Sequence, residues 1–173
     1  MMRLADRENQ APGEALWRFS LALYTRPGVA DALITIQDRA GADVNVILYG
    51  LWLGLTRGRL LGAADVAAAE AAIAPVHDAA VAPLRRLRRQ LKPTGDAVLQ
   101  ALRRRIAALE VAAERQVLYR LAECSGGPAP VSADGGRIAA AEANLAVILG
   151  DEAGSPEAGL VRRAVAALAR RTG

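Results

Sequence analysis

Apolar residues recur three and four positions apart along most of the chain, which is the spacing of one face of an α-helix. The first stretch with this pattern predicts a helix over residues 12–23. Pro27 and Asp31 suit the first turn of a second helix, which we expect to end at Gly41. Asp43 then has the residue type and position of an N-terminal cap for a third helix.

The third predicted helix is apolar nearly all round as far as Leu55, so we expect it to lie at the centre of the fold. Gly50 and Gly54 would share one of its faces. Two glycines on one face allow the backbone of another helix to approach closely, and we therefore expect tight helix packing there.

A long helical stretch is predicted over residues 64–91, with a break or kink near Pro75 and near Pro83. The next predicted helix covers residues 96–123 and would be roughly 40 Å long. Because only residues 92–95 separate the two, they should form an antiparallel hairpin. The residues expected to face inward on the second arm are Leu99, Leu102, Ile106, Leu109, Ala113, Val117 and Leu121.

Two shorter helices are predicted after a Gly, Pro and Ser-rich loop, over residues 137–149 and 156–171. The expected fold is all-α: a compact orthogonal and antiparallel bundle of about seven helices that includes the long hairpin. The expected domain organisation is a helical core domain over residues 1–123, a linker over residues 124–136, and a C-terminal helix pair over residues 137–173 packed on the same domain.

The composition agrees with helix and excludes several classes of site. Aromatic residues make up only 3% of the chain, and Ala, Leu and Arg are abundant. One cysteine, Cys124, and one histidine, His77, cannot supply a zinc site, and a single cysteine cannot form an internal disulfide. No signal peptide is visible, and the apolar run over 44–55 is too short to span a bilayer. We expect a cytoplasmic protein without a metal or cofactor.

The charge is concentrated in the predicted hairpin. The interval 85–105 carries eight basic residues against Asp96 alone, a net charge of +7. The rest of the chain has 14 basic and 17 acidic residues, a net −3, which gives the overall +4. Folding back of the hairpin would bring both basic segments to one place. The candidate binding residues are Arg85, Arg86, Arg88, Arg89, Lys92, Arg103, Arg104 and Arg105.

Three interpretations of this basic surface remain open. It can be a solvated face whose guanidinium groups pair with acids of other helices, such as Glu14, Asp31 or Asp38. Glu110 and Glu114, one to three turns away, would offset the charge only in part. It can bind RNA, DNA or phosphate groups. It can also dock on a membrane surface or an acidic protein. No aromatic residue lies between positions 85 and 105, which argues against base stacking by this segment.

A second candidate site is polar and lies between the second and third predicted helices. Asp38, Asp43 and Asn45 could act in acid–base chemistry or offer oxygen ligands to Mg²⁺, and could equally cap helices. His77 has no Ser or Cys near it in sequence, so we interpret it as a structural or surface histidine. No phosphate-binding glycine loop followed by Lys and Ser or Thr is present.

Three stretches carry a resemblance to a known family. They are residues 17–53, which include a PGV…IQD..G.DVN pattern, PLRRLRRQLK (83–92) and EVAAERQVL (110–118). Together they resemble the shared region of a proteobacterial family of conserved hypothetical proteins, a domain of unknown function, over residues 14–121. Ile36 stands where that family's pattern has Leu. The resemblance implies an all-helical fold and brings no catalytic residue.

Taken together, the sequence predicts a binding or scaffolding partner that uses the basic hairpin surface. The partner would be an acidic protein surface or a nucleic acid. The alternatives are a nucleic-acid-binding module directed at the phosphate backbone and an enzyme with Asp38 and Asp43 in a helical cleft.

Overall fold

The computed structural model describes residues 12–125 and 136–170, and these residues form helices and connecting turns with no β-strand. The predicted all-α fold is therefore confirmed. Most of the predicted linker, residues 126–135, lies outside the described residues, as do residues 1–11 and 171–173. The α-helices are α2 (Pro12–Tyr24), α3 (Val29–Ala40), α4 (Val44–Arg57), α5 (Ala63–Val76), α6 (Ala82–Gln90), α7 (Ala97–Glu123), α8 (Gly136–Leu149) and α9 (Pro156–Ala169).

Helix ends follow the local sequence closely. The carboxylate of Asp43 accepts a hydrogen bond of 2.7 Å from the backbone N–H of Asn45, so Asp43 caps α4 as predicted. Gly41 ends α3 with a φ of 70°, a conformation in which glycine is favoured. Pro27, however, lies outside α3. Gly28 has a φ of 77° and separates the proline from the first turn.

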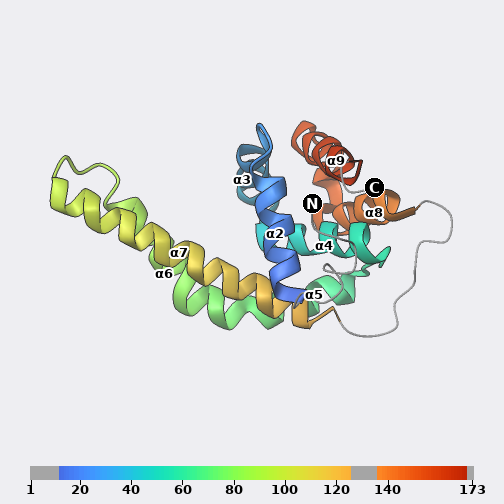
Figure 1. Cartoon of the computed structure of the whole chain (residues 1–173), viewed down its shortest axis with the longest axis horizontal. Helices are drawn as coiled ribbons and strands as arrows, with labels where there is room; N and C mark the ends of the chain where they lie inside the picture. Colours follow the sequence, from blue (N-terminus) through green and yellow to red (C-terminus); the bar gives the residue numbers. More distant parts are fainter. Residues whose placement is uncertain (1–11, 126–135, 171–173) are drawn as a thin grey trace, which may run out of the picture.

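Helix α4 is the centre of the fold, because residues 45–54 form an unbroken run of buried positions. One side of α4 packs with α3, α8 and α9, where Leu33, Leu145 and Val161 are fully buried. Its other side packs with α2, α5 and α7 in a second apolar cluster. Figure 1 shows α4 crossing behind α2 and beside α8.

Helix α8 packs on α4 through a close backbone contact and a buried amide. Gly54 lies directly against the backbone of Ala141, as the predicted role of the glycines requires. The Asn144 side chain accepts from the Leu61 N–H at 2.8 Å and donates to the carbonyl of Gly50 at 2.9 Å. It also donates to the carbonyl of Arg59, so one side chain of α8 satisfies three backbone groups beside α4.

Helices α5 and α6 are joined by η1 (His77–Val81), a π-helical segment, so residues 63–90 form one continuous helix. The Ala82 N–H donates to the carbonyl of His77, five residues back, and Pro83 has no N–H to give. The predicted interruption near Pro75 and Pro83 is thus a π-helical turn between them. Counted this way, the described residues hold seven helices, besides the short 3₁₀ turn η2 (Gly150–Gly154).

The α6–α7 hairpin projects from the rest of the molecule as an arm (Figure 1). Ile106, Val117 and Leu121 of α7 are buried as predicted. The prediction was wrong for Leu99, Leu102 and Leu109, which are exposed at 37%, 45% and 58%. Two helices cover only one face of each other, and no third described helix reaches the end of the arm.

Candidate functional site

A groove of about 490 Å³ lies at the base of the projecting hairpin, between it and helices α2, α3 and α4. We call it the Arg groove. Its arginines are Arg85, Arg88, Arg89, Arg103 and Arg104. Its carboxylates are Glu110 and Glu114, and most of its remaining lining is apolar.

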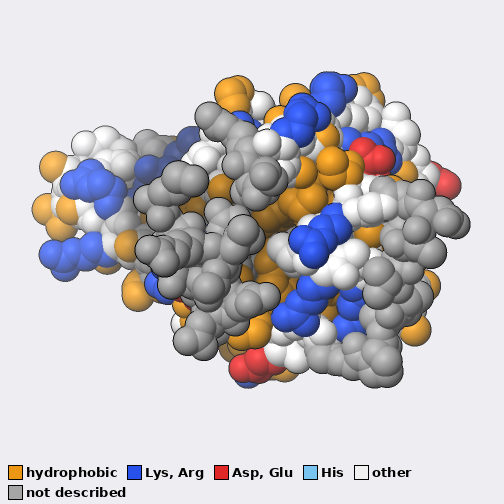
Figure 2. Space-filling view, turned by 45° about the vertical axis from the view of Figure 1, so that its right-hand side comes forward, with side chains coloured by type: hydrophobic (Ala, Val, Ile, Leu, Met, Phe, Trp, Pro, Cys, Tyr) orange, Lys and Arg blue, Asp and Glu red, His pale blue; other side chains and the backbone are white. Residues whose placement is uncertain are grey.

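The two basic segments of the sequence meet in this groove. Arg85, Arg88 and Arg89 come from α6, and Arg103 and Arg104 come from α7. The other three predicted binding residues, Arg86, Lys92 and Arg105, are exposed but do not line the groove. Figure 2 shows Lys and Arg side chains beside hydrophobic ones on the projecting end of the molecule. The structure therefore divides the eight residues into a groove set of five and an outer set of three.

Two of the groove arginines are neutralised by carboxylates of α7. Arg85 donates from Nε to Glu110 at 3.0 Å and from Nη2 to Glu114 at 2.7 Å. Arg88 also donates to Glu110, through both Nε and Nη2. These acids belong to the hairpin itself, one helical turn apart, and not to the neighbouring helices. Glu14 pairs instead with Arg18 and Arg115.

The two carboxylates differ in their protonation behaviour. Burial would raise the pKa of Glu110, but the hydrogen bonds from Arg88 and Arg85 outweigh it and hold the pKa below the usual value. Burial dominates at Glu114 and raises the pKa of its carboxyl, even though Arg85 pairs with it. Glu110 therefore stays ionised to a lower pH than Glu114, which gains a proton first as the pH falls.

The remaining three groove arginines, Arg89, Arg103 and Arg104, have no carboxylate within salt-bridge distance among the described residues. The Nε atom of Arg103 is buried and makes no hydrogen bond to a residue that the structure describes. Among the described lining residues, five arginines against two glutamates leave a surplus of three positive charges. An anionic group is the chemical species that this surplus favours.

Of the second set of predicted site residues, only Asn45 reaches the groove. Asp38 is exposed on α3 and does not line it. The Asp43 carboxylate accepts the capping hydrogen bond at the N-terminus of α4. Asn45 is buried, and its side-chain amide makes no hydrogen bond to another described residue. It offers one polar group at the inner side of the groove.

Neither metal chemistry nor the single histidine gains support from the described residues. No group of three or more His, Cys, Asp or Glu side chains among them is placed to hold a metal ion. His77 lies on η1 with its Nδ1 3.2 Å from the Asp78 carboxylate, and it does not line the groove. None of the described helices combines the length and apolar character needed to cross a membrane.

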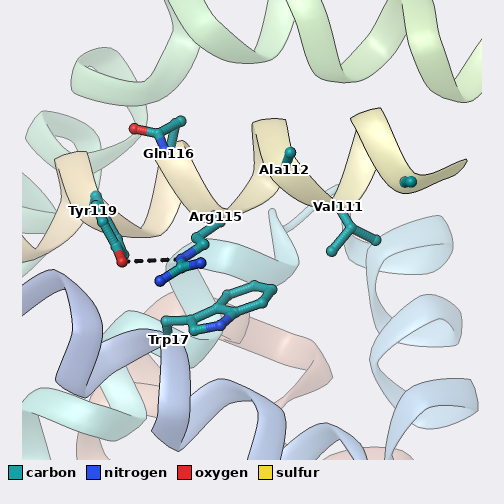
Figure 3. A pocket seen from close by; sticks show the side chains of 7 residues that line it. Trp17, Val111, Ala112, Arg115, Gln116 and Tyr119 are labelled. Carbon is teal, nitrogen blue, oxygen red and sulfur yellow. Dashed lines mark hydrogen bonds between the residues drawn. The ribbon is translucent and has the colours of Figure 1, made fainter. Parts of the chain in front are cut away.

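A second hollow of about 520 Å³ lies on the outer side of α7 (Figure 3). The Arg115 guanidinium stacks over the rings of Trp17 and Tyr119, at 5.6 and 5.3 Å from their centroids. Arg115 and the Tyr119 hydroxyl both donate to the Glu14 carboxylate, at 2.6 and 2.7 Å. The Glu14 carboxylate of α2 is thus held by two side chains of α7, so we interpret the hollow as a structural contact.

Sequence reasoning gave Glu110 and Glu114 only a partial role in offsetting the basic residues and did not select Trp17 or Tyr24; all four line the groove. Glu110 carried a usable signal. It falls on the same face of α7 as Ile106 and Val117, so the helical period places a carboxylate on a buried stripe. The two aromatic residues of α2 carried none, because only the fold brings them beside the hairpin.

Comparison with protein families matched residues 15–121, more than half of the chain. All described lining residues of the Arg groove, from Trp17 to Leu118, fall within that region, whereas α8 and α9 lie beyond it. Searches of curated proteins and of solved structures found no match. The chain belongs to the family described as "Protein of unknown function (DUF2390)".

Proposed function

We propose that this chain is a binding protein that holds an anionic group of its ligand or partner in the Arg groove. The observation that carries the proposal is the position of Arg89, Arg103 and Arg104. They come from two segments of the chain, line one groove, and have no carboxylate partner among the described residues.

Electrostatics gives the reason for preferring these three residues over the whole basic hairpin. Bringing like charges together costs free energy unless an opposite charge offsets it. Glu110 and Glu114 provide that charge for Arg85 and Arg88. A bound anion would provide it for the other three, and its charge-assisted hydrogen bonds would be stronger inside a groove than on an open surface.

The test compares two triple variants that change the net charge equally. Arg89→Glu, Arg103→Glu and Arg104→Glu reverse the groove set without a partner. Arg86→Glu, Lys92→Glu and Arg105→Glu reverse the outer set of the same hairpin. Binding of pyrophosphate is measured by calorimetry at fixed ionic strength. We expect the groove variant to lose more than about tenfold in affinity and the outer variant to stay near the parent protein.

Circular dichroism of both variants checks that the hairpin still folds. Equal loss in the two variants would show that the anion responds to the general charge of the arm, and the groove assignment would then be wrong. Full retention of pyrophosphate binding by the groove variant would contradict the proposal directly.

Nucleic-acid binding is a second candidate, and one observation favours it. Tyr24 of α2 lines the groove beside the arginines and is 37% exposed, so an aromatic ring accompanies the basic groups after all. A gel-shift assay with mixed RNA and DNA at two salt concentrations tests it. Binding through phosphates must weaken steeply with salt, and reversal of three arginines should reduce that dependence by about three counterions.

A further inference from the structure

We infer that the Arg groove takes a small amphiphilic anion, with a phosphate or carboxylate head on Arg89, Arg103 and Arg104 and an aliphatic body on the opposite wall. The inference rests on the proposed function and names the class of ligand. It follows from the distribution of polar and apolar side chains around the groove.

The wall opposite the hairpin includes large apolar side chains that the fold leaves open. Leu21 of α2 and Ile34 of α3 are exposed at 45% and 43%, and both line the groove. Val44 and Leu48 of α4 extend this lining. Large apolar side chains gathered in one hollow mark a ligand-binding surface more often than single exposed ones do.

Two of the polar side chains on that wall already have hydrogen-bond partners within the protein. Ser20 donates to the carbonyl of Leu16 at 2.8 Å, and Thr25 donates to the carbonyl of Leu21 at 2.9 Å. Their hydroxyl protons are therefore not offered to a ligand. The amides of Gln37 and Asn45, which make no side-chain hydrogen bond to the described residues, suit a single ester or carbonyl oxygen near the head group.

A flat base fits this wall less well than an aliphatic chain. Trp17 lines the groove, but the Arg115 guanidinium lies over its ring at 5.6 Å and occupies one face. Tyr24 is then the only other aromatic ring among the lining residues. The volume of about 490 Å³ lies in the range of small-molecule sites, and it favours a compact ligand over an extended strand.

The same chemistry has two sources, a free amphiphile and a phospholipid in a bilayer. Both present an anionic head joined to an aliphatic chain. The experiment therefore uses soluble probes to test the chemistry and vesicles to identify the source.

Three probes separate head from chain: inorganic phosphate, octyl phosphate and octyl glucoside, each below its micelle concentration and titrated into the full chain. Each buried methylene is worth roughly fourfold in affinity. We expect octyl phosphate to bind about a hundredfold more tightly than phosphate, and more tightly than the neutral glucoside. Adenosine monophosphate binding more tightly than octyl phosphate would overturn the aliphatic assignment.

Variants of the apolar wall test where the chain lies. Leu21→Asn with Ile34→Asn should lower octyl phosphate affinity by about tenfold and leave phosphate affinity unchanged. The matched control is Val98→Asn with Leu109→Asn, two exposed apolar residues of α7 that do not line the groove. An equal effect of the control pair would overturn the placement of the chain.

The outcomes separate this inference from the proposed function. Octyl phosphate that binds no more tightly than phosphate, with both lost on reversal of Arg89, Arg103 and Arg104, would overturn the inference and leave the anion site standing. Neither probe binding would overturn both. Vesicles of phosphatidylcholine, with and without phosphatidylglycerol, then identify the source of the ligand. Vesicle binding that requires both phosphatidylglycerol and the three arginines supports a lipid in a bilayer. Tight binding of octyl phosphate without any binding to vesicles supports a free amphiphile.

Discussion

Gly54 of α4 packs directly on the backbone of Ala141 of α8, so closely that a Cβ atom at position 54 would overlap main-chain atoms. Main-chain atoms cannot move aside as the end of a flexible side chain can. Gly54→Ala should therefore lower the free energy of unfolding by about 3 kcal/mol, through overpacking of the α4–α8 contact. Urea denaturation followed by circular dichroism measures the change.

Two other glycines calibrate that result. A Cβ at Gly50 would meet Cδ1 of Ile148 at 2.6 Å, and this atom can rotate away, so Gly50→Ala should cost less. Gly95 has no atom of a described residue within 4 Å of an added Cβ, and Gly95→Ala should leave stability nearly unchanged. A loss for Gly54→Ala no larger than that for Gly95→Ala would show that the helices do not approach as described.

Asn144 is a fully buried amide that serves three backbone groups, the N–H of Leu61 and the carbonyls of Gly50 and Arg59. Asn144→Ala leaves the Leu61 N–H and the Arg59 carbonyl without this partner and removes one hydrogen bond from the Gly50 carbonyl, and we expect a loss of about 3 kcal/mol in unfolding free energy. The matched control is Asn45→Ala, since the Asn45 amide serves no described backbone group. Similar losses for the two variants would contradict the hydrogen-bonding role of Asn144.

Glu110 holds the base of the hairpin together, because its carboxylate accepts from Arg85 and Arg88 across the two arms. Its side chain is 7% exposed, while the two arginines are partly open to solvent. Glu110→Gln should cost about 2 kcal/mol, below the value for a fully buried pair because solvent screens the arginines. Thermal unfolding measures it.

Glu123→Gln is the control for that substitution. Glu123 lies at the end of the same helix, is exposed, and makes no salt bridge with a described residue. It should change stability little. If Glu110→Gln were equally mild, the ion pairs at the base of the hairpin would contribute nothing to holding the arms together.

The sequence predicted the elements of the fold well because their signals are local. A few neighbouring residues are enough to predict each of three features: the N-terminal cap at Asp43, the helix end at Gly41 and the apolar run of α4. The exposure of Leu102 and Leu109 was not predictable in this way. Their helical spacing matches a buried stripe, and only the three-dimensional structure shows that no described helix covers the outer part of the arm.

The sequence predicted the arginines of the candidate site but not their pairing or the apolar wall opposite them. Charge density and the short turn located the arginines, and the hairpin geometry explains why two segments meet. The division between Arg88, which is paired, and Arg89, which is not, depends on where each guanidinium points relative to Glu110. The apolar wall of Leu21 and Ile34 depends on how α2 and α3 pack beside the hairpin, which no local pattern encodes.

The Glu14 carboxylate accepts hydrogen bonds from Tyr119, Arg115 and Arg18, and these lower its pKa from 4.5 to about 2. A carboxyl whose pKa is lowered by folding stabilises the folded protein at every pH above its ordinary pKa of 4.5. This contribution to stability disappears as the pH falls from 4.5 through about 2. The stability difference between the parent protein and Glu14→Gln should therefore be constant above pH 4.5 and shrink below it. The ¹³C resonance of the Glu14 carboxyl should titrate in the folded protein with a midpoint at pH about 2. Tyr119→Phe removes the largest cause, so the Glu14 titration should move upward; an unchanged midpoint would mean that the hydroxyl does not hold the carboxylate.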